Sequence, residues 1–183
     1  LIEQVQSASR QSFTPQTNTQ QSFDIRFSHA IKVLFFSVRN MTWGSEWSNY
    51  MTNSPVTIGT TTNFTPGLSA DPIMQTSLIY ENTNRLAQMG SDYFSLVNPY
   101  YHAPVIPTAT GYHMYSYSLD FICLDPMGST NYGKLTNVSI VPESSPQAFL
   151  AATGAGGAGG QGRAEGWGGG EPSLYASYRI VKL

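Results

Sequence analysis

The residues most suggestive of chemistry lie in the segment GSTNYGK, where Gly128, Gly133 and Lys134 match most of a phosphate-binding loop. In such a loop, backbone amides and the lysine hold phosphates, a Ser or Thr after the lysine binds Mg²⁺, and a helix follows. Here Leu135 follows the lysine, and the next residues alternate between apolar and polar as a β-strand does. We therefore predict a turn between two strands at this position and no nucleotide site.

The histidines and acidic residues form no pattern typical of a metal or catalytic site. His29, His102 and His113 lie in separate segments, and no cysteines accompany them at the spacing of a zinc site. We expect these histidines to be hydrogen-bonded structural residues, and we expect no metal, no cofactor and no catalytic residue. Asp120 and Asp125 cannot be assigned as a glycosidase pair from sequence, and Asp125, which precedes a proline, is typical of a turn.

Aromatic side chains in two long predicted loops, residues 40–55 and 98–111, are the candidates for contacts with a partner. They are Trp43, Trp47, Tyr50, Tyr100 and Tyr101. Such rings stack on sugars and are also enriched at protein interfaces, so they indicate either glycan binding or contact with another subunit.

Composition bounds the class of protein. The 183 residues suggest one domain with an adequate core, because a chain of this length buries about 70% of its unfolded surface. Only 11% of residues are charged, and the net charge of −2 leaves no electrostatic footprint for nucleic acid. A weakly charged, polar and aromatic surface suits a protein that neighbours cover, and equally an extracellular binding module.

The single cysteine and the apolar runs exclude two further features. Cys123 cannot form an internal disulfide, and we predict a buried, inert thiol on the same strand face as Tyr115 and Phe121. No apolar run approaches the roughly 20 residues of a membrane span. The first residue is Leu and not Met, so we expect a processed or partial product.

The order of predicted elements is that of an all-β protein. Residues 1–22 are polar and predict an arm or linker with little core of its own. Phe23, Ile25 and Phe27 alternate as in a strand, and residues 31–40 form a denser apolar run that predicts a strand covered on both faces. Further short strands are expected at 55–61, 72–80 and 92–97, a single helical turn within 81–90, and a loop at 98–111.

The second half contains the clearest strand and a glycine-rich loop. Residues 112–124 alternate regularly and predict a strand, and alternation resumes through Leu135, Val138 and Ile140. Ten of the 17 glycines fall between residues 154 and 170, so 153–170 predicts a flexible loop. Residues 173–183 then predict a last strand that returns to the sheet. Short strands without a long helix favour an antiparallel sandwich or jelly roll over residues 23–183.

Three segments together resemble a known family. They are RFSHAIKVLFFSVRN, LIYENTNRLAQMGSDYFSLVNPYYHAP and GYHMYSYSLDF with DPMGSTNYGKLTNVSIVPE. Over residues 23–145 the chain resembles the C-terminal part of the major capsid proteins of large nucleocytoplasmic DNA viruses, closest to the iridovirus type. That family has the motif YSYSL followed by P.GS.NYGRLTN as strand, turn and strand. Here Tyr115–Leu119 and Gly128–Gly133 occupy those positions, with Lys134 where the family often has Arg.

The resemblance implies a structural protein and its partners. It implies an eight-stranded jelly-roll sandwich that is the second half of a double jelly roll, in a subunit that trimerises into pseudo-hexagonal capsomers tiling an icosahedral shell. The implied partners are identical subunits, the N-terminal jelly roll of the same polypeptide, and minor capsid or cement proteins, without direct nucleic-acid or membrane contact. The implied location is the virion, assembled in the host cytoplasm. A lectin or fibre-head jelly roll that binds glycans is the alternative, and a β-sandwich hydrolase is the weakest.

Overall fold

The computed structural model describes residues 2–9, 11–15, 20–40, 48–52, 55–58, 61–64, 70–153 and 174–182. In this part of the chain the strands are β1 Gln4–Ser7, β2 Gln11–Phe13, β3 Phe23–Asp24, β4 Ala30–Ile31, β5 Val33–Asn40, β6 Pro55–Ile58, β7 Thr61–Phe64, β8 Ile73–Tyr80, β9 Thr83–Gly90, β10 His113–Ser116, β11 Thr130–Asn131, β12 Val138–Ser144 and β13 Leu174–Lys182. The helical segments are the π-helix η2 Tyr93–Val97, α1 Asn98–His102, the 3₁₀-helix η3 Tyr132–Lys134 and α2 Pro146–Thr153.

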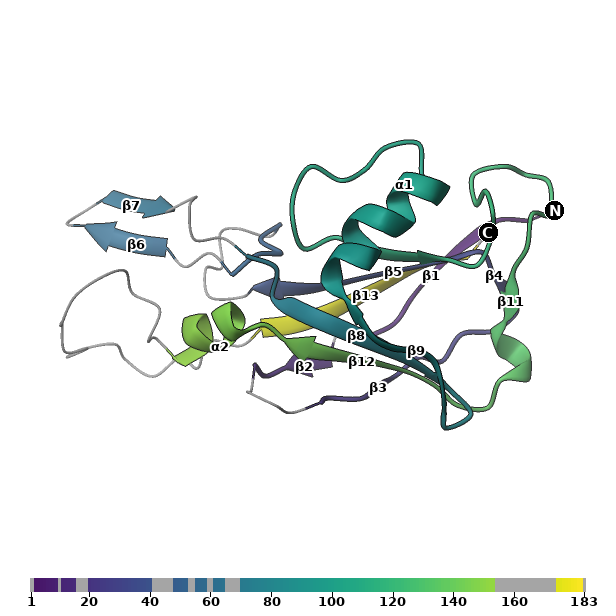
Figure 1. Cartoon of the computed structure of the whole chain (residues 1–183), viewed down its shortest axis with the longest axis horizontal. Helices are drawn as coiled ribbons and strands as arrows, with labels where there is room; N and C mark the ends of the chain where they lie inside the picture. The colour runs from purple at the N-terminus through teal and green to yellow at the C-terminus, as the bar shows by residue number, and fades with distance from the viewer. Residues whose placement is uncertain are drawn as a thin grey trace.

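Two antiparallel sheets stack face to face (Figure 1). The first has the order β1-β13-β5-β10, with β2 also pairing with β13, and the second has the order β3-β12-β8-β9. Strands from the start and the end of the chain are neighbours in both sheets, which is the double-sheet arrangement of a jelly roll. The all-β jelly-roll prediction is therefore confirmed. The described residues contain more strands than the eight expected, since the two sheets have five and four strands and β4–β11 and β6–β7 add two short pairs.

The core lies between the two sheets. The inner face of β5 is buried, whereas Phe35, Ser37 and Arg39 on its outer face are half-buried, so the predicted coverage of both faces holds only in part. Leu34, Phe36 and Val38 point into the main core, which includes Ile73 of β8 and Ile140 of β12. On the opposite face of β5, Val33 belongs to a small second cluster with Met114 and Phe121. Alternate side chains of β5 thus belong to two different apolar clusters, one on each face of the first sheet.

The described residues of the predicted arm differ from the prediction, because β1 and β2 take part in the sandwich. β1 pairs with β13 from Gln4 to Ser7, and β2 pairs with β13 from Gln11 to Phe13. Phe13 is only 1% exposed and packs against Phe23 in the main core, with ring centroids 6.3 Å apart. The polar composition gave no indication of β1 and β2, because a strand pairs through its backbone and needs few apolar side chains to do so.

The helical turn predicted within residues 81–90 is wrong, because β9 occupies this segment and pairs with β8. Glu81 and Asn82 both have positive φ, 47° and 62°, as in a tight hairpin turn of the primed type. Gln88, with φ 47°, lies where the register shifts. The bulge lets Leu86 and Met89 both pack against the core although they are three residues apart, a spacing that imitates a helix.

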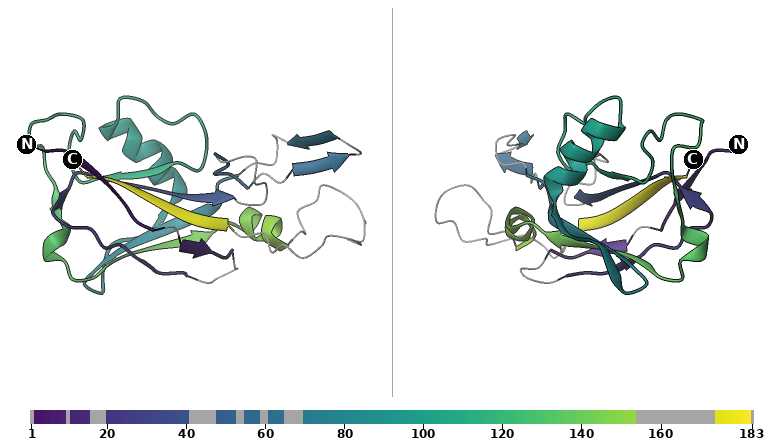
Figure 2. Two further views of the ribbon diagram at one scale, coloured as in Figure 1. Left: turned by 180° about the vertical axis from the view of Figure 1, so that it is seen from behind. Right: turned by 45° about the vertical axis from the view of Figure 1, so that its right-hand side comes forward.

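The strand predicted at 92–97 is also wrong, and so is the fully irregular loop at 98–111, because η2 and α1 are helical from Tyr93 to His102. Phe94 and Asn98 are buried, whereas Val97 and Tyr101 are exposed, as expected of one covered helical face. Asn98 Oδ1 accepts a hydrogen bond from the backbone amide of Ser116 at 3.0 Å. This bond fastens the helix to β10, with which α1 is in contact, and both views of Figure 2 show the teal helical segment on one side of the sandwich.

The strand predicted at 112–124 ends early. β10 stops at Ser116, and the chain then curls across the outer face of the first sheet. Ser116 and Ser118 are buried, while Leu119 is 73% exposed, so the predicted alternation fails beyond the strand. Cys123, predicted to be buried, is half-buried.

The end of the chain follows its prediction. β13 lies between β1 and β5, so the last strand is central in the first sheet. Residues 154–170 of the predicted glycine-rich loop lie outside the described residues, and Thr153 ends α2.

Candidate functional site

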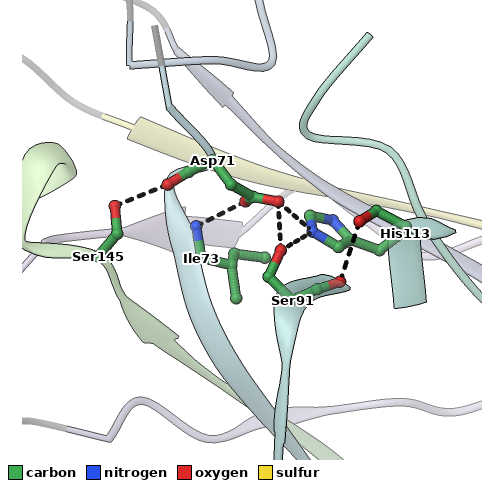
Figure 3. A network of polar contacts seen from close by, with 6 residues as sticks. Asp71, Ile73, Ser91, His113 and Ser145 are labelled. Atoms are coloured by element: carbon green, nitrogen blue, oxygen red, sulfur yellow. Dashed lines mark hydrogen bonds and ion pairs between the residues drawn. The ribbon is translucent and has the colours of Figure 1, made fainter. Parts of the chain in front are cut away.

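A buried Asp–Ser–His cluster joins the two sheets at one end of the sandwich (Figure 3). His113, on β10, has its Nε2 atom 2.7 Å from Asp71 Oδ2 and 3.0 Å from Ser91 Oγ. The Ser91 hydroxyl also donates to Asp71 Oδ2. Two further hydrogen bonds hold Asp71 in place. Its Oδ1 accepts from the Ile73 amide at 2.8 Å, and its backbone carbonyl accepts from Ser145 Oγ at 2.7 Å.

The geometry of this cluster does not match a Ser–His–Asp catalytic triad. A triad places the carboxylate on one ring nitrogen and the serine on the other, so that the histidine relays a proton between them. Here both partners contact Nε2 of His113, whose Nδ1 is buried without a hydrogen-bond partner among the residues that the structure describes. The ring is 2% exposed and stacks on Phe36, with centroids 5.1 Å apart. We conclude that Asp71, Ser91 and His113 form a structural tie between strands.

Three tyrosine hydroxyls form a second buried network at the opposite end of the same strands. Tyr117 lies 2.6 Å from both Tyr80 and Tyr132, and the Tyr80 and Tyr132 hydroxyls are 3.2 Å apart. Burial raises the pKa of all three phenols, most clearly at Tyr117 and Tyr132, because desolvation disfavours a phenolate. The triangle therefore stays neutral and joins β8 to the segments after β10 and β11.

The segment Gly128–Lys134 contains a glycine in the left-handed region, the short strand β11 and the 3₁₀-helix η3. Gly128 has a φ of +116°, a conformation that L side chains rarely adopt. The Asn131 side chain accepts from the Gly133 amide at 3.0 Å, and the backbone at Leu135 is extended. A phosphate loop needs an α-helix after its lysine, whereas here the 3₁₀-helix η3 ends at Lys134 and β12 follows. The predicted single turn is instead a longer connection from β10 to β12 that contains β11 and η3.

The structure separates the five candidate interface aromatics. Tyr100 and Tyr101 lie together on α1, 67% and 72% exposed, with ring centroids 5.2 Å apart. Tyr50 is half-buried and packs on Tyr112, at 5.1 Å. Trp43 and Trp47 lie outside the described residues. Which of these rings contacts a partner stays a prediction.

Sequence reasoning missed an exposed apolar loop after β10. Four side chains in this loop are exposed, namely Leu119 at 73%, Ile122 at 52%, Leu124 at 66% and Met127 at 42%. We call the segment Leu119–Met127, which carries these four side chains, the apolar loop. The alternation of apolar and polar residues over 115–121 favoured a buried strand that continues to Leu124. Only the early end of β10 places these side chains on the surface.

Neither a cluster of metal ligands nor a membrane-spanning helix is found among the described residues. Among those residues, no group of three or more His, Cys, Asp or Glu side chains could hold a metal ion. Within the same ranges, no helix is long and apolar enough to cross a bilayer. His29 is exposed, and His102 contacts the Leu119 carbonyl through Nδ1 at 3.0 Å.

Comparison with solved structures gives the class of protein. The fold superimposes on the PBCV-1 virus capsid with a TM-score of 0.63 and 18% identity, covering 98% of this chain and 47% of that one. It superimposes on the Faustovirus major capsid protein with a TM-score of 0.60 and 11% identity, covering 99% and 32%. The sandwich thus has the fold of viral capsid jelly rolls.

Sequence relatives give the family. The chain is 71% identical over 157 residues to the major capsid protein of Wiseana iridescent virus, covering 86% of this chain and 32% of that protein. It is 48% identical over 140 residues to that of Frog virus 3, covering 76% and 30%. Residues 1–165 match the family described as large eukaryotic DNA virus major capsid protein, and the chain belongs to this family. It spans about a third of the length of these relatives.

Proposed function

We propose that this chain is the second jelly roll of a major capsid protein that trimerises into pseudo-hexagonal capsomers and tiles an icosahedral shell. The observation that carries the proposal is the 71% identity over 86% of the chain to an iridescent virus major capsid protein. Because the chain spans about a third of such relatives, we assign it to a longer parent polypeptide with an N-terminal jelly roll. The shell then forms through repeated contacts between identical closed trimers.

The proposed partners are identical subunits, the N-terminal jelly roll of the parent polypeptide, and minor capsid or cement proteins. The net charge of −2 argues against direct nucleic-acid contact. We place the protein in the virion shell after assembly in the host cytoplasm. In this proposal the jelly-roll domain comprises residues 23–183 together with β1 and β2, which pair with β13.

A structural role, and not catalysis, fits the buried polar groups. The hydroxyl of Ser91 donates to Asp71, and Nε2 of His113 faces both residues, so the imidazole does not stand between serine and carboxylate as it does in a catalytic triad. In the described part of the chain, the tyrosine triangle is equally enclosed by its own hydrogen bonds. Both networks stabilise the sandwich that the shell requires.

Tyr100 and Tyr101 are the proposed contacts between subunits that the structure supports best. Both are exposed on α1, and the buried Phe94 and Asn98 hold the helix against the sandwich. Rigid, exposed aromatic residues are efficient contacts, because little conformational entropy is lost when they are covered. Trp43, Trp47 and Tyr50 remain further proposed contacts.

Analytical ultracentrifugation of the parent polypeptide tests the proposal. We expect a mass three times that of one chain at tens of micromolar, and we expect Tyr100→Ser with Tyr101→Ser to weaken the trimer. The matched control is Met74→Ser, which removes a 47% exposed apolar side chain from β8. A stable monomer that binds a defined sugar on a glycan array would support the lectin alternative and overturn the capsid proposal.

A further inference from the structure

The apolar loop is held rigidly although its side chains face solvent. Phe121, in its middle, is buried and packs edge-on against Phe35 of β5, with centroids 6.0 Å apart. Asp120 Oδ1 accepts from the amides of Ile122 at 2.9 Å and Cys123 at 3.2 Å. The Leu119 amide donates to the Met127 carbonyl at 3.1 Å and closes the loop.

A rigid loop that exposes several large apolar side chains is typical of a contact surface. Leaving such groups in water costs about 25 cal/mol per Å² of apolar area relative to burying them. Clustered exposure of this kind marks an interaction site, whereas scattered single residues do not. The loop is also preorganised, so that covering it would cost little conformational entropy. The jelly roll itself does not use this surface, because Phe121 alone of the loop's apolar residues enters a core cluster.

The start of the described chain lies against this loop. Lys32, which is only 4% exposed, donates to the Cys123 carbonyl at 2.8 Å and contacts Glu3 Oε1 at 3.3 Å. The buried ammonium group of Lys32 therefore links Glu3, which precedes β1, to Cys123 in the middle of the loop. Figure 1 shows the N-terminus and this loop at the same end of the sandwich. Ile2, beside Glu3, is 91% exposed. Its side chain adds a further apolar group at this end.

We infer that the apolar loop is the docking surface for the segment of the parent polypeptide that precedes residue 1. This inference rests on the proposed function, which assigns an N-terminal jelly roll to that segment. The relatives are about three times as long as this chain, so the parent has ample polypeptide to cover the loop. A covalently attached partner that enters beside the loop has a high effective concentration there, which favours it over a second copy.

Thiol labelling of the parent polypeptide tests the inference. Leu124→Cys and, as a second position, Leu119→Cys are made in a background in which Cys123 and any other cysteine are serine. Each is labelled in the trimer, in the monomer obtained by dilution, and in urea as the reference for full exposure. We expect labelling at least about tenfold slower than in urea for both positions, already in the monomer, because the attached segment covers them.

Tyr101→Cys in the same background is the matched control for the interface between subunits. It is expected to be protected only in the trimer, so a failure at Tyr101 bears on the proposed function and a failure at the loop bears on this inference. Fast labelling of both loop positions in monomer and trimer would overturn the inference. Protection of the loop in the trimer alone would also overturn it, because the occupant would then be a second copy.

Discussion

At the scale of single residues, two enclosed polar networks stabilise the sandwich at positions where the two sheets could otherwise separate. Asp71, Ser91 and His113 join the strands at one end, and the tyrosine triangle joins them at the other. A buried hydrogen bond contributes only about 1 kcal/mol net, but leaving one partner unsatisfied costs about 1–3 kcal/mol. Disrupting such a network is therefore costly mainly because it leaves buried polar groups without hydrogen-bond partners.

Tyr117→Phe should lower the free energy of unfolding by about 1–3 kcal/mol, because it leaves the Tyr80 and Tyr132 hydroxyls without their shortest bonds. Thermal unfolding of the parent polypeptide measures the change. Tyr100→Phe is the matched control, since that hydroxyl belongs to a 67% exposed residue and its loss should change little. Equal melting temperatures for the two variants would show that the triangle contributes no stability.

Alkaline pH should destabilise the protein through the same three residues. Their pKa values are raised in the folded state above the ordinary value of 10.0, so the unfolded chain loses protons that the folded chain keeps. Stability is therefore fully present below pH 10 and falls as the pH rises above it. The readout is the melting temperature between pH 8 and pH 11. A variant with all three tyrosines changed to Phe should show a shallower decline, and an unchanged slope would contradict the assignment.

At the scale of elements, the β8–β9 hairpin shows how a turn can oppose local preference. Glu81 and Asn82 adopt positive φ, which costs energy for residues with side chains. The Glu81 carboxylate offsets this cost by accepting from the amides of Thr136 and Asn137. The turn is thereby fixed to the segment before β12, which pairs with the same strand β8.

Asn82→Gly should leave stability unchanged or raise it by up to about 1 kcal/mol, because glycine adopts positive φ without strain. Glu81→Gly relieves the same strain but removes an acceptor from two amides, so we expect a net loss of about 1 kcal/mol. Melting temperatures of the two variants of the parent polypeptide decide between these effects. Stabilisation by Glu81→Gly would mean that the carboxylate contacts are worth less than the backbone strain.

The last strand should be far more important for folding than the glycine-rich segment that precedes it. Loop-closure entropy changes by only about 0.6 kcal/mol per doubling of length, so replacing residues 154–170 by a short linker should be tolerated. Deleting residues 174–182 removes β13 from between β1 and β5 and leaves two strand edges unpaired. Thermal melts compare the two deletions in the parent polypeptide. Unfolding by the first and not the second would disprove the central position of β13.

At the scale of the whole molecule, the exposed apolar residues are concentrated in particular elements. Tyr100 and Tyr101 lie on α1, and Leu119 and Leu124 lie in the apolar loop. His102 connects these elements through its contact with the Leu119 carbonyl. A jelly roll with two such surfaces fits a subunit that is covered on more than one side, as obligate interfaces of about 2,000 Å² or more require.

Produced without the rest of the parent polypeptide, the 183-residue chain should associate non-specifically, because both surfaces stay uncovered. Light scattering over a concentration series measures this association. Leu119→Lys with Leu124→Lys should reduce it, and exchange of the exposed Asn84 for Lys serves as the matched charge control. A chain that stays monomeric at all concentrations would show that neither surface requires a partner.

The sequence by itself determined the all-β class, the strand β5, the special backbone conformation at Gly128 and the family. These features depend on alternation, glycine positions and motif order, all of which are local properties of the chain. Tertiary structure alone decided that residues 83–90 form a strand, because pairing with β8 and a bulge at Gln88 outweigh their helical spacing. It also decided that Leu119 is exposed and that His113 meets Asp71 and Ser91. Each of these depends on contacts between residues distant in the chain, which local patterns do not record.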